Sequence, residues 1–509
     1  MAFDVYTYCW NEEHLLPLFL HHYRQARRIL VLIDDTTDDN SRDIVLAAGR
    51  EVRPYSILEL DGHSEPGGSN TKGIRNNVWK ESRGLVDWVI TQDPDEFLHF
   101  PEYPGDIASG LNAMQNKGYQ AIKLTAYNMF CTDEEWEKID PTKPIHEQLT
   151  RGKRIRNIFS RTTYDKINVF NPNIINETKF HVGAHFWSPD PADIKIAPAI
   201  NIAKMLHLKH TGPKRELNRR IKYRNRILPT SLVEMGIGGA YIKTDEEHAN
   251  EISTIYSAPD IVDLTVPSKP SVLCVITHKN RYDALAQCLQ SIDRQTIKPD
   301  LVAIYDDSIP KENISTSLSC PVAIIYTSGI GAHEGHQISN TSGYDLVWRL
   351  HDDCIAEPDV LEKLLSRMTP EVGAVSGIVC DPDKPGKIHK DVRIESLATF
   401  DTGHIQLDPD SGVYDDVDFL HTSFLYRANI VNYKDTNISP IGYHEDTIFT
   451  HRLKRAGYKL VIDTAIKTKH ILYPTGGRKL GSVEWRTSAH EWDYAEFLKI
   501  MREEWNLKV

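Results

Sequence analysis

The chain of 509 residues begins the same succession of elements twice, and this repeat constrains its fold more than any other feature. Each half opens with an apolar segment, an amphipathic segment and a second apolar segment that ends in two aspartates. These are residues 3–9, 13–24 and 28–33 with Asp34 and Asp35, and residues 271–277, 281–295 and 301–305 with Asp306 and Asp307. Strand, helix and strand with short connections predict a parallel sheet with crossover helices. A repeat of this size indicates two α/β domains that arose by duplication or fusion.

The length also favours two domains, because one hydrophobic core rarely serves more than about 250–300 residues. The join is predicted at residues 256–270, where several prolines interrupt any helix. We therefore predict an N-terminal domain over residues 1–255, a linker over 256–270 and a C-terminal domain over 271–509.

Composition limits the class of protein. The net charge of -12 argues against bulk affinity for nucleic acid or anionic membranes. No apolar run approaches about 18 residues, so no membrane span is expected, and the N-terminus reads as a strand rather than a signal peptide. The seven cysteines form no paired CxxC motif, which indicates free thiols rather than disulfides or structural zinc. We expect a soluble cytoplasmic protein.

The paired aspartates lie where nucleotides commonly bind. Ligands of open parallel sheets bind outside the carboxyl ends of the strands, where a carboxylate can accept hydrogen bonds from a base or ribose. Asp34, Asp35, Asp306 and Asp307 are therefore candidate nucleotide-binding residues. A turn or helix N-cap aspartate is the alternative for any one of them. Their occurrence in both halves favours the nucleotide.

A second set of acids follows another apolar strand in each half, with a lone histidine about 110 residues downstream. Mg²⁺ and Mn²⁺ take carboxylate ligands together with substrate phosphates, and they offset the charge of a departing diphosphate. A neutral imidazole can complete such a site. The candidate metal ligands are Asp93, Asp95 and His207 in the first half and Asp352, Asp353 and His470 in the second. The alternatives are loop-start acids and hydrogen-bonded structural histidines.

Glu445 and Asp446 stand at the start of a predicted helix that Gly457 closes. Asp446 is the candidate general base that deprotonates an acceptor hydroxyl. The alternative is an acid that merely complements the helix dipole.

Residues 204–226 hold nine Lys or Arg against the single acid Glu216. The favoured interpretation is a solvated helix face that pairs with acids elsewhere. The alternatives are diphosphate binding near His207 or contact with a polyanionic acceptor such as nucleic acid.

Residues 271–470 resemble family 2 glycosyltransferases of the GT-A fold. The shared motifs are Thr277-His-Lys-Asn-Arg281, Tyr305-Asp-Asp-Ser308, Leu350-His-Asp-Asp-Cys354, Gly442-Tyr-His-Glu-Asp446 and the terminal His470. The resemblance implies that Thr277 and the first aspartate pair bind the nucleotide, that the later acids hold a metal and that Glu445-Asp446 supplies the base. His351 stands where many relatives have the first acid of the DxD motif, so metal binding there rests on Asp352 and Asp353.

Residues 1–230 resemble related family-2-like or family-92-like glycosyltransferases. The shared elements are Trp10-Asn11-Glu12, Asp34-Asp35, Lys72-Gly73 with Arg75-Asn76, Asp93-Pro-Asp95-Glu96-Phe97, and Lys179 with His185 and His207. The resemblance implies that Asn11, Lys72 and Arg75 also contact the nucleotide. This half has no helix start comparable to Glu445-Asp446, so its base is unassigned.

Together these features predict two GT-A, Rossmann-like domains in tandem. We expect a bifunctional glycosyltransferase that uses UDP- or GDP-linked sugar donors with Mn²⁺ or Mg²⁺ and adds two sugars in sequence to a hydroxyl of a glycan or other biopolymer. One alternative is a single active transferase domain with a carbohydrate-binding or scaffold partner domain. Another is a viral-type enzyme that acts on hydroxymethylated bases of DNA in the host cytoplasm. Nucleotidyl transfer is disfavoured, because neither first-strand turn is a Gly-rich phosphate loop.

Overall fold

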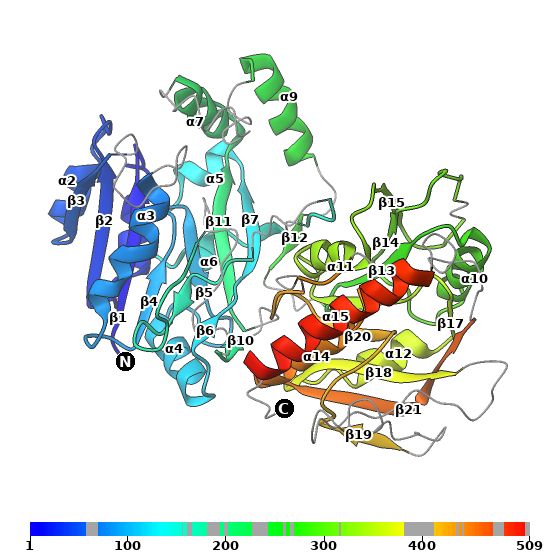
Figure 1. Cartoon of the computed structure of the whole chain (residues 1–509). Helices are drawn as coiled ribbons and strands as arrows, with labels where there is room; N and C mark the ends of the chain where they lie inside the picture. Colours follow the sequence, from blue (N-terminus) through cyan, green and yellow to red (C-terminus); the bar gives the residue numbers. More distant parts are fainter. Residues whose placement is uncertain are drawn as a thin grey trace. The chain divides into compact units, whose positions relative to one another are not determined.

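The chain forms two compact units in the computed structural model (Figure 1). The N-terminal unit contains residues 1–155 and 163–268, and the C-terminal unit contains residues 156–162 and 269–509. The structure describes residues 1–56, 70–154, 156–159, 165–180, 194–197, 202–225, 243–257, 261–264, 269–314, 317–380, 412–433, 437–439, 442–471 and 483–503. The expected α/β fold class is confirmed in both units.

A seven-stranded sheet with the order β10-β6-β9-β4-β1-β2-β3 forms the core of the N-terminal unit. Its strands are β1 (Phe3–Cys9), β2 (Arg28–Asp34), β3 (Glu51–Tyr55), β4 (Trp88–Thr91), β6 (Ala121–Ile122), β9 (Val169–Phe170) and β10 (Ile196–Ala197). β1 is parallel to β2 and β4, and β2 is parallel to β3, whereas β9 runs antiparallel to β4 and β6. Every residue of β1 and β4 is buried, as expected for central strands of a largely parallel sheet covered on both faces.

A second sheet of the N-terminal unit has the order β12-β8-β7-β11-β5. Its strands are β5 (Glu96–His99), β7 (Thr125–Cys131), β8 (Arg151–Arg154), β11 (Lys204–Thr211) and β12 (Val262–Asp263). β12 lies within the predicted linker and pairs with β8, so this part of the predicted linker extends a sheet of the N-terminal unit.

The C-terminal unit contains a nine-stranded sheet with the order β15-β14-β13-β16-β20-β18-β21-β17, in which β19 also pairs with β21. Its strands are β13 (Val272–His278), β14 (Leu301–Asp306), β15 (Val322–Tyr326), β16 (Leu346–Arg349), β17 (Cys354–Ala356), β18 (Val372–Cys380), β19 (Val413–Asp415), β20 (Phe424–Arg427) and β21 (Lys459–His470). The strands β15-β14-β13-β16 are parallel, like β3-β2-β1-β4. The next two pairs, β16-β20 and β20-β18, are antiparallel, like β4-β9 and β9-β6. Six strands therefore follow one topology in both units.

Helices connect and cover these sheets. In the N-terminal unit they are α1 (Leu16–His22), α2 (Ser41–Ala47), α3 (Asn70–Asn77), the 3₁₀ helix η1 (Val78–Ser82), α4 (Ile107–Asn116), α5 (Asp133–Glu137), α6 (Ile145–Gln148), α7 (Pro213–Asn225) and α9 (Asp245–Tyr256). In the C-terminal unit they are α10 (Tyr282–Asp293), α11 (Ala332–Asn340), α12 (Val360–Ser366), α14 (Glu445–Arg455) and α15 (Val483–Glu503). α15, red in Figure 1, packs through Phe497, Ile500 and Met501 against Ile448 of α14.

The predicted helices occur with shifted ends. The helix expected over residues 13–24 is the shorter α1, and Pro17 lies in its first turn, where a missing amide hydrogen costs little. Within the described residues, no helix has the length and apolar character needed to cross a bilayer. Six cysteines of the described part are free and buried, as the sequence predicted.

Candidate active site

The turn after β16 carries the second acid cluster. β16 is fully buried, and in the following turn the amide of Cys354 donates to the carbonyl oxygen of His351 (3.0 Å) before β17 begins. Residues 351–353 therefore lie at the carboxyl end of a parallel strand. That edge of the sheet is where ligands of such folds bind.

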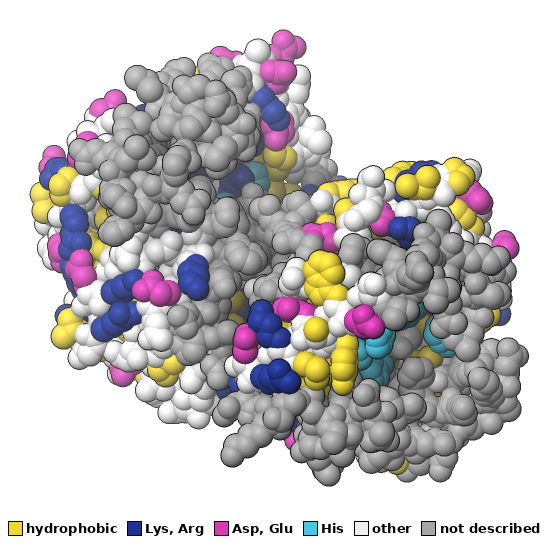
Figure 2. Space-filling view, in the orientation of Figure 1, with side chains coloured by type: hydrophobic (Ala, Val, Ile, Leu, Met, Phe, Trp, Pro, Cys, Tyr) yellow, Lys and Arg dark blue, Asp and Glu magenta, His cyan; other side chains and the backbone are white. Residues whose placement is uncertain are grey.

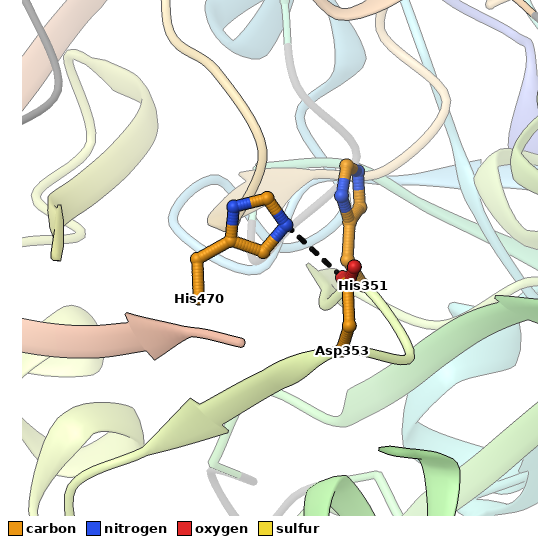
Figure 3. A group of neighbouring side chains, drawn as sticks. All are labelled: His351, Asp353 and His470. Atoms are coloured by element: carbon orange, nitrogen blue, oxygen red, sulfur yellow. Dashed lines mark hydrogen bonds and ion pairs between the residues drawn. The ribbon is translucent and has the colours of Figure 1, made fainter. Parts of the chain in front are cut away.

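β21 brings His470 to this turn. His470 pairs with Cys354 in the antiparallel β17–β21 register, and the amide of Ile471 donates to the carbonyl oxygen of Asp353 (2.8 Å). The imidazole Nε2 of His470 lies 3.1 Å from Oδ1 of Asp353. Figure 3 shows the side chains of His351, Asp353 and His470 gathered around one point.

These three side chains can hold a divalent cation. One ligand atom from each residue lies within 4.8 Å of the other two. Burial and the charge of Arg349 lower the pKa of His351 to about 3, so its imidazole is neutral. Burial alone would raise the pKa of Asp353, but the hydrogen bond with His470 and the charge of Arg281 outweigh it and hold the pKa at about 2. An ionised carboxylate with neutral imidazole is a suitable donor set for a divalent metal.

Asp352 belongs to a different set of contacts. Its Oδ2 accepts hydrogen bonds from Nδ1 of His278 (2.8 Å) and Nε of Arg281 (3.1 Å), and the residue is fully buried. Arg281 also pairs with Asp353. Of the three ligands predicted in this half, the structure brings Asp353 and His470 together with His351, and it places Asp352 in a buried ion pair.

Arg349, the last residue of β16, connects the His351 group to the acids at the start of α14. Its Nη2 donates to Nε2 of His351 (3.0 Å) and pairs with Glu445. Its Nη1 lies 3.4 Å from Oδ2 of Asp446. A single guanidinium therefore contacts both the candidate metal site and the candidate base.

Glu445 and Asp446 differ in environment. Burial raises the pKa of Glu445 to about 7, against the opposing charge of Arg349. Burial would also raise the pKa of Asp446, but its hydrogen bond with His421 and the charge of Arg349 outweigh this and hold the pKa well below its usual range. The side chain of Asp446 is 16% exposed and that of Glu445 is 5% exposed. Asp446 is therefore the ionised and the more exposed of the two acids.

Aromatic rings of α15 cover the segment before α14. His444 stacks on Phe497 with ring centroids 4.8 Å apart, and Tyr443 meets His490 edge to face at 5.0 Å. Histidine and acidic side chains reach the surface over α15 (Figure 2). The buried carboxylate of Asp493 accepts hydrogen bonds from the amide of Ser439 (2.6 Å), its hydroxyl (2.8 Å) and the amide of Tyr443 (2.9 Å). α15 thus holds the segment that presents Asp446.

The first aspartate pair of the C-terminal unit ends β14. Asp306 is buried, and it accepts hydrogen bonds from the amide of Ser308 (2.9 Å) and the hydroxyl of Tyr282 (3.1 Å). Oδ1 of Asp307 accepts a hydrogen bond from the amide of Gly329 (2.5 Å). Thr277 lies half-buried near the end of the adjacent β13. These residues share one edge of the sheet with His351.

The same local geometry recurs at the end of β2. Oδ1 of Asp34 accepts a hydrogen bond from the amide of Thr36 (3.0 Å). In the same way, Oδ1 of Asp306 accepts a hydrogen bond from the amide of Ser308. Asn11 and Asn280, which follow β1 and β13, both have left-handed backbones with φ of 54° and 57°. Each side-chain oxygen accepts a backbone amide across the edge of the sheet, from Asp38 (2.9 Å) and Ile309 (3.0 Å) respectively. Asp35 is exposed, and the side chain of Lys72 lies outside the described part of the chain.

The turn of Asp93 and Asp95 is also built like that of His351 and Asp353. The amide of Glu96 donates to the carbonyl oxygen of Asp93 (2.9 Å). His207 pairs with Glu96 in the antiparallel β5–β11 register, and the amide of Leu208 donates to the carbonyl oxygen of Asp95 (2.7 Å). In both units a histidine on an antiparallel strand therefore meets the turn at the same register position.

The side chains around the N-terminal turn differ from those of the C-terminal turn. Arg75 lies 2.6 Å from Asp93, and Lys166 lies 3.6 Å from Asp93 and 2.5 Å from Glu96. Arg219 of α7 lies 3.1 Å from Asp95 and 2.8 Å from Glu12, and His207 lies 3.3 Å from Asp95. Arg75, predicted to contact a nucleotide, is a buried partner of Asp93.

Several residues of the site were not assigned a role from the sequence: His351, Arg281, Arg349, Lys166 and Arg219. His351 had a usable signal, since it occupies the first position of the DxD-like motif. Arg281 follows the turn after β13, and Arg219 belongs to the basic stretch. Arg349 and Lys166 had no sequence signal, because a single cation near a strand is common.

Comparison with known proteins agrees with this geometry for the C-terminal unit. Residues 273–432 match the model of a family described as Glycosyl transferase family 2. The matched segment contains His351 and Asp353 and ends before Glu445. The match supports sugar transfer as the chemistry of this unit and, with its strand order, a GT-A fold. No curated protein sequence matches the chain.

Three solved structures show a partial likeness. A crystal structure of S. aureus TarS 1–349 is 12% identical with a TM-score of 0.29, over 40% of this chain and 60% of that one. A crystal structure of S. aureus TarS is 14% identical with a TM-score of 0.28, over 40% and 37%. A crystal structure of GalNAc-T7 with UDP, GalNAc and Mn²⁺ is 14% identical with a TM-score of 0.33, over 47% and 55%. The chain thus covers less than two thirds of each.

Proposed function

We propose that the C-terminal unit is a metal-dependent glycosyltransferase that moves a sugar from a nucleoside-diphosphate donor to an acceptor hydroxyl with inversion at the anomeric carbon. One observation carries this proposal: Arg349 contacts both His351 of the candidate metal group and Asp446. One guanidinium therefore joins the candidate metal group, which would meet the leaving diphosphate, to the candidate base, which would meet the acceptor hydroxyl.

His351, Asp353 and His470 would hold Mn²⁺ or Mg²⁺. When bound, the cation offsets the charge that develops on the departing diphosphate. Asp306, Asp307 and Thr277 would bind the nucleotide at the same edge of the sheet. The UDP- or GDP-linked nature of the donor is part of this proposal.

In the chemical step, the acceptor oxygen forms a bond to the anomeric carbon while the bond from that carbon to the diphosphate breaks. Asp446 takes the proton of the acceptor hydroxyl, and the nucleoside diphosphate leaves with the bonding electron pair. Asp446 suits this role because it is ionised at neutral pH and more exposed than Glu445. Glu445 instead fixes Arg349, since its carboxylate is buried against that guanidinium.

For the N-terminal unit we propose a second nucleotide-sugar site. The support is the shared topology of six strands and the equal register of His207 and His470. Two such sites would add two sugars in sequence. A binding unit without transfer activity is the alternative, because the sequence of this unit has no helix start comparable to Glu445-Asp446.

A DNA acceptor gains no support from α7. Three of its basic side chains pair with acids of their own unit: Arg219 with Glu12, Arg220 with Glu216 and Lys222 with Asp38. We therefore propose a glycan or another uncharged hydroxyl acceptor.

A donor screen tests the proposal. UDP- and GDP-sugars are incubated with the full chain and Mn²⁺, and release of nucleoside diphosphate is measured. The wild-type chain should turn over at least one donor in a Mn²⁺-dependent manner, and Asp353→Asn should remove this Mn²⁺-dependent turnover. Unchanged Mn²⁺-dependent turnover in Asp353→Asn would contradict the assignment. So would a wild-type chain in which Mn²⁺ promotes the binding of neither UDP nor GDP.

A further inference from the structure

The charged groups around the two turns differ in kind and in burial, although the backbones of the turns match. Around the C-terminal turn, Asp353 lies beside the imidazoles of His351 and His470 and pairs with Arg281, whose side chain is 23% exposed. Around the N-terminal turn, the carboxylates of Asp93, Asp95 and Glu96 face three permanent cations. These cations are Arg75, Lys166 and Arg219.

The N-terminal cations are built into the unit. The side chains of Arg75 and Lys166 are 5% and 3% exposed, and removing either from its carboxylate would leave a buried charge without its partner, which is costly. A divalent cation bound to Asp93 would enter this buried space beside two positive charges. Asp93 is therefore already neutralised by buried cations, and a divalent cation would have to bind through the other two predicted ligands, Asp95 and His207.

Arg219 is the cation of this group that a ligand can reach. Its side chain is 28% exposed, and one nitrogen, Nη2, contacts both Asp95 and Glu12. A guanidinium carries five N–H donors in a planar fork that matches phosphate oxygens. Arg219 contacts the N-terminal turn at Asp95, and the equivalent turn of the C-terminal unit is the one whose residues would hold the metal.

We propose that the two units neutralise a diphosphate by different means, so that the chain binds one divalent cation at His351, Asp353 and His470, while the N-terminal unit binds a nucleoside diphosphate through Arg219 without a metal. This inference rests on the proposed nucleotide-sugar site of the N-terminal unit. It assigns Arg219 as the binding residue and Arg75 and Lys166 as positioning residues that keep the acids neutralised.

The first test counts metal ions. Mn²⁺ is titrated into the full chain and free Mn²⁺ is followed by electron paramagnetic resonance. One Mn²⁺ should bind per chain, His470→Ala should remove it, and His207→Gln should leave the stoichiometry unchanged. Two Mn²⁺ per chain, or loss of one with His207→Gln, would overturn the inference.

The second test measures nucleotide binding in EDTA. UDP and GDP are titrated by calorimetry into the His470→Ala chain. One of them should bind, and Arg219→Gln should weaken binding by at least about tenfold, with partial rescue by Arg219→Lys. Arg24→Gln, an exposed change in the same unit, serves as the control.

The outcomes separate the two proposals. Binding of a nucleotide to the N-terminal unit only with Mn²⁺ would overturn the inference and leave the proposed function standing. Absence of nucleotide binding with and without Mn²⁺ would overturn both. Binding in EDTA that Arg219→Gln does not weaken would overturn the assignment of Arg219.

Discussion

The imidazole of His470 lies 3.1 Å from the carboxylate of Asp353, although 117 residues separate them in sequence. The antiparallel register of β17 and β21 sets this contact, because it places His470 opposite Cys354. A ligand pair fixed by backbone pairing needs little reorganisation when a cation binds.

We therefore expect His470→Gln to weaken Mn²⁺ binding by at least about tenfold, because one of three candidate ligands is lost. Calorimetric titration of Mn²⁺ measures this. Lys469→Gln is the matched control, since Lys469 is an exposed neighbour on the same strand. Equal affinity in the two variants would contradict the metal assignment.

Replacing the proposed base should affect the chemical step alone. Asp446→Asn should lower kcat by about 10²- to 10⁴-fold, the usual contribution of general base catalysis. Donor affinity should stay within about twofold. Steady-state kinetics with the donor found in the screen measures both, with Asp359→Asn, a partly exposed acid on the same unit, as control. A loss confined to KM would argue against Asp446 as base.

The contact between α15 and the segment before α14 should support both stability and activity. Asp493→Ala removes three hydrogen bonds from a buried carboxylate, so we expect a loss of about 3 kcal/mol in the free energy of unfolding. Turnover should also fall at temperatures where the chain is folded, since Tyr443 loses its anchor. Glu491→Ala, exposed on the same helix, should change neither quantity. Urea unfolding and turnover assays measure the two effects.

The close approach of α4 to Phe100 leaves no room for a side chain at Gly110. A Cβ at Gly110 would lie 2.2 Å from Cδ2 of Phe100. Gly110→Ala gains about 1 kcal/mol of helix propensity, but the clash should outweigh it and destabilise the N-terminal unit by about 1–3 kcal/mol. Urea unfolding measures the change.

Two further variants test the cause. Phe100→Leu combined with Gly110→Ala should be less destabilised than the sum of the single changes, because the smaller side chain makes room. Asn112→Ala, exposed on the same helix, should be slightly stabilising. An additive double variant would show that the ring contact is not the reason.

The buried His22 should make the N-terminal unit sensitive to acid. Burial lowers the pKa of His22 to about 4, and its Nε2 donates to the carbonyl oxygen of Leu98 (2.7 Å). Because the folded pKa is depressed, the stability it contributes is present above the unfolded pKa of about 6.5 and is lost as pH falls toward about 4. Below a pH of about 4, this loss amounts to about 3 kcal/mol of the free energy of unfolding.

The slope of unfolding free energy against pH reports how many protons the chain takes up on unfolding. His22→Gln should therefore reduce this number by up to about one proton in this pH range. Urea unfolding at several pH values measures the slope. His14→Gln is the control, because the His14 side chain is 67% exposed. An unchanged slope in His22→Gln would show that His22 is protonated equally in both states.

Local features of the sequence predicted the architecture well. The period of the apolar residues located β1, β2, β13 and β14, because a buried strand flanked by polar turns leaves a clear local pattern. The aspartates at the strand ends could be placed at one edge of the sheet, since parallel strands all end there. The repeated order of motifs indicated that both halves share a topology, and the six equivalent strands have one.

The identity of the charges in each site was decided by the tertiary structure. Asp352 and Asp353 are neighbours in sequence, yet one pairs with His278 and the other meets His470, because adjacent side chains leave a turn in different directions. Arg219 reaches Glu12 across 207 residues, a contact that no local pattern contains. Sequence determined where acids stand along each strand, whereas packing determined which cations or imidazoles surround them. A charge pair between distant residues depends on how α7 packs within the N-terminal unit and how β21 pairs within the C-terminal unit, and this packing is a property of each folded unit.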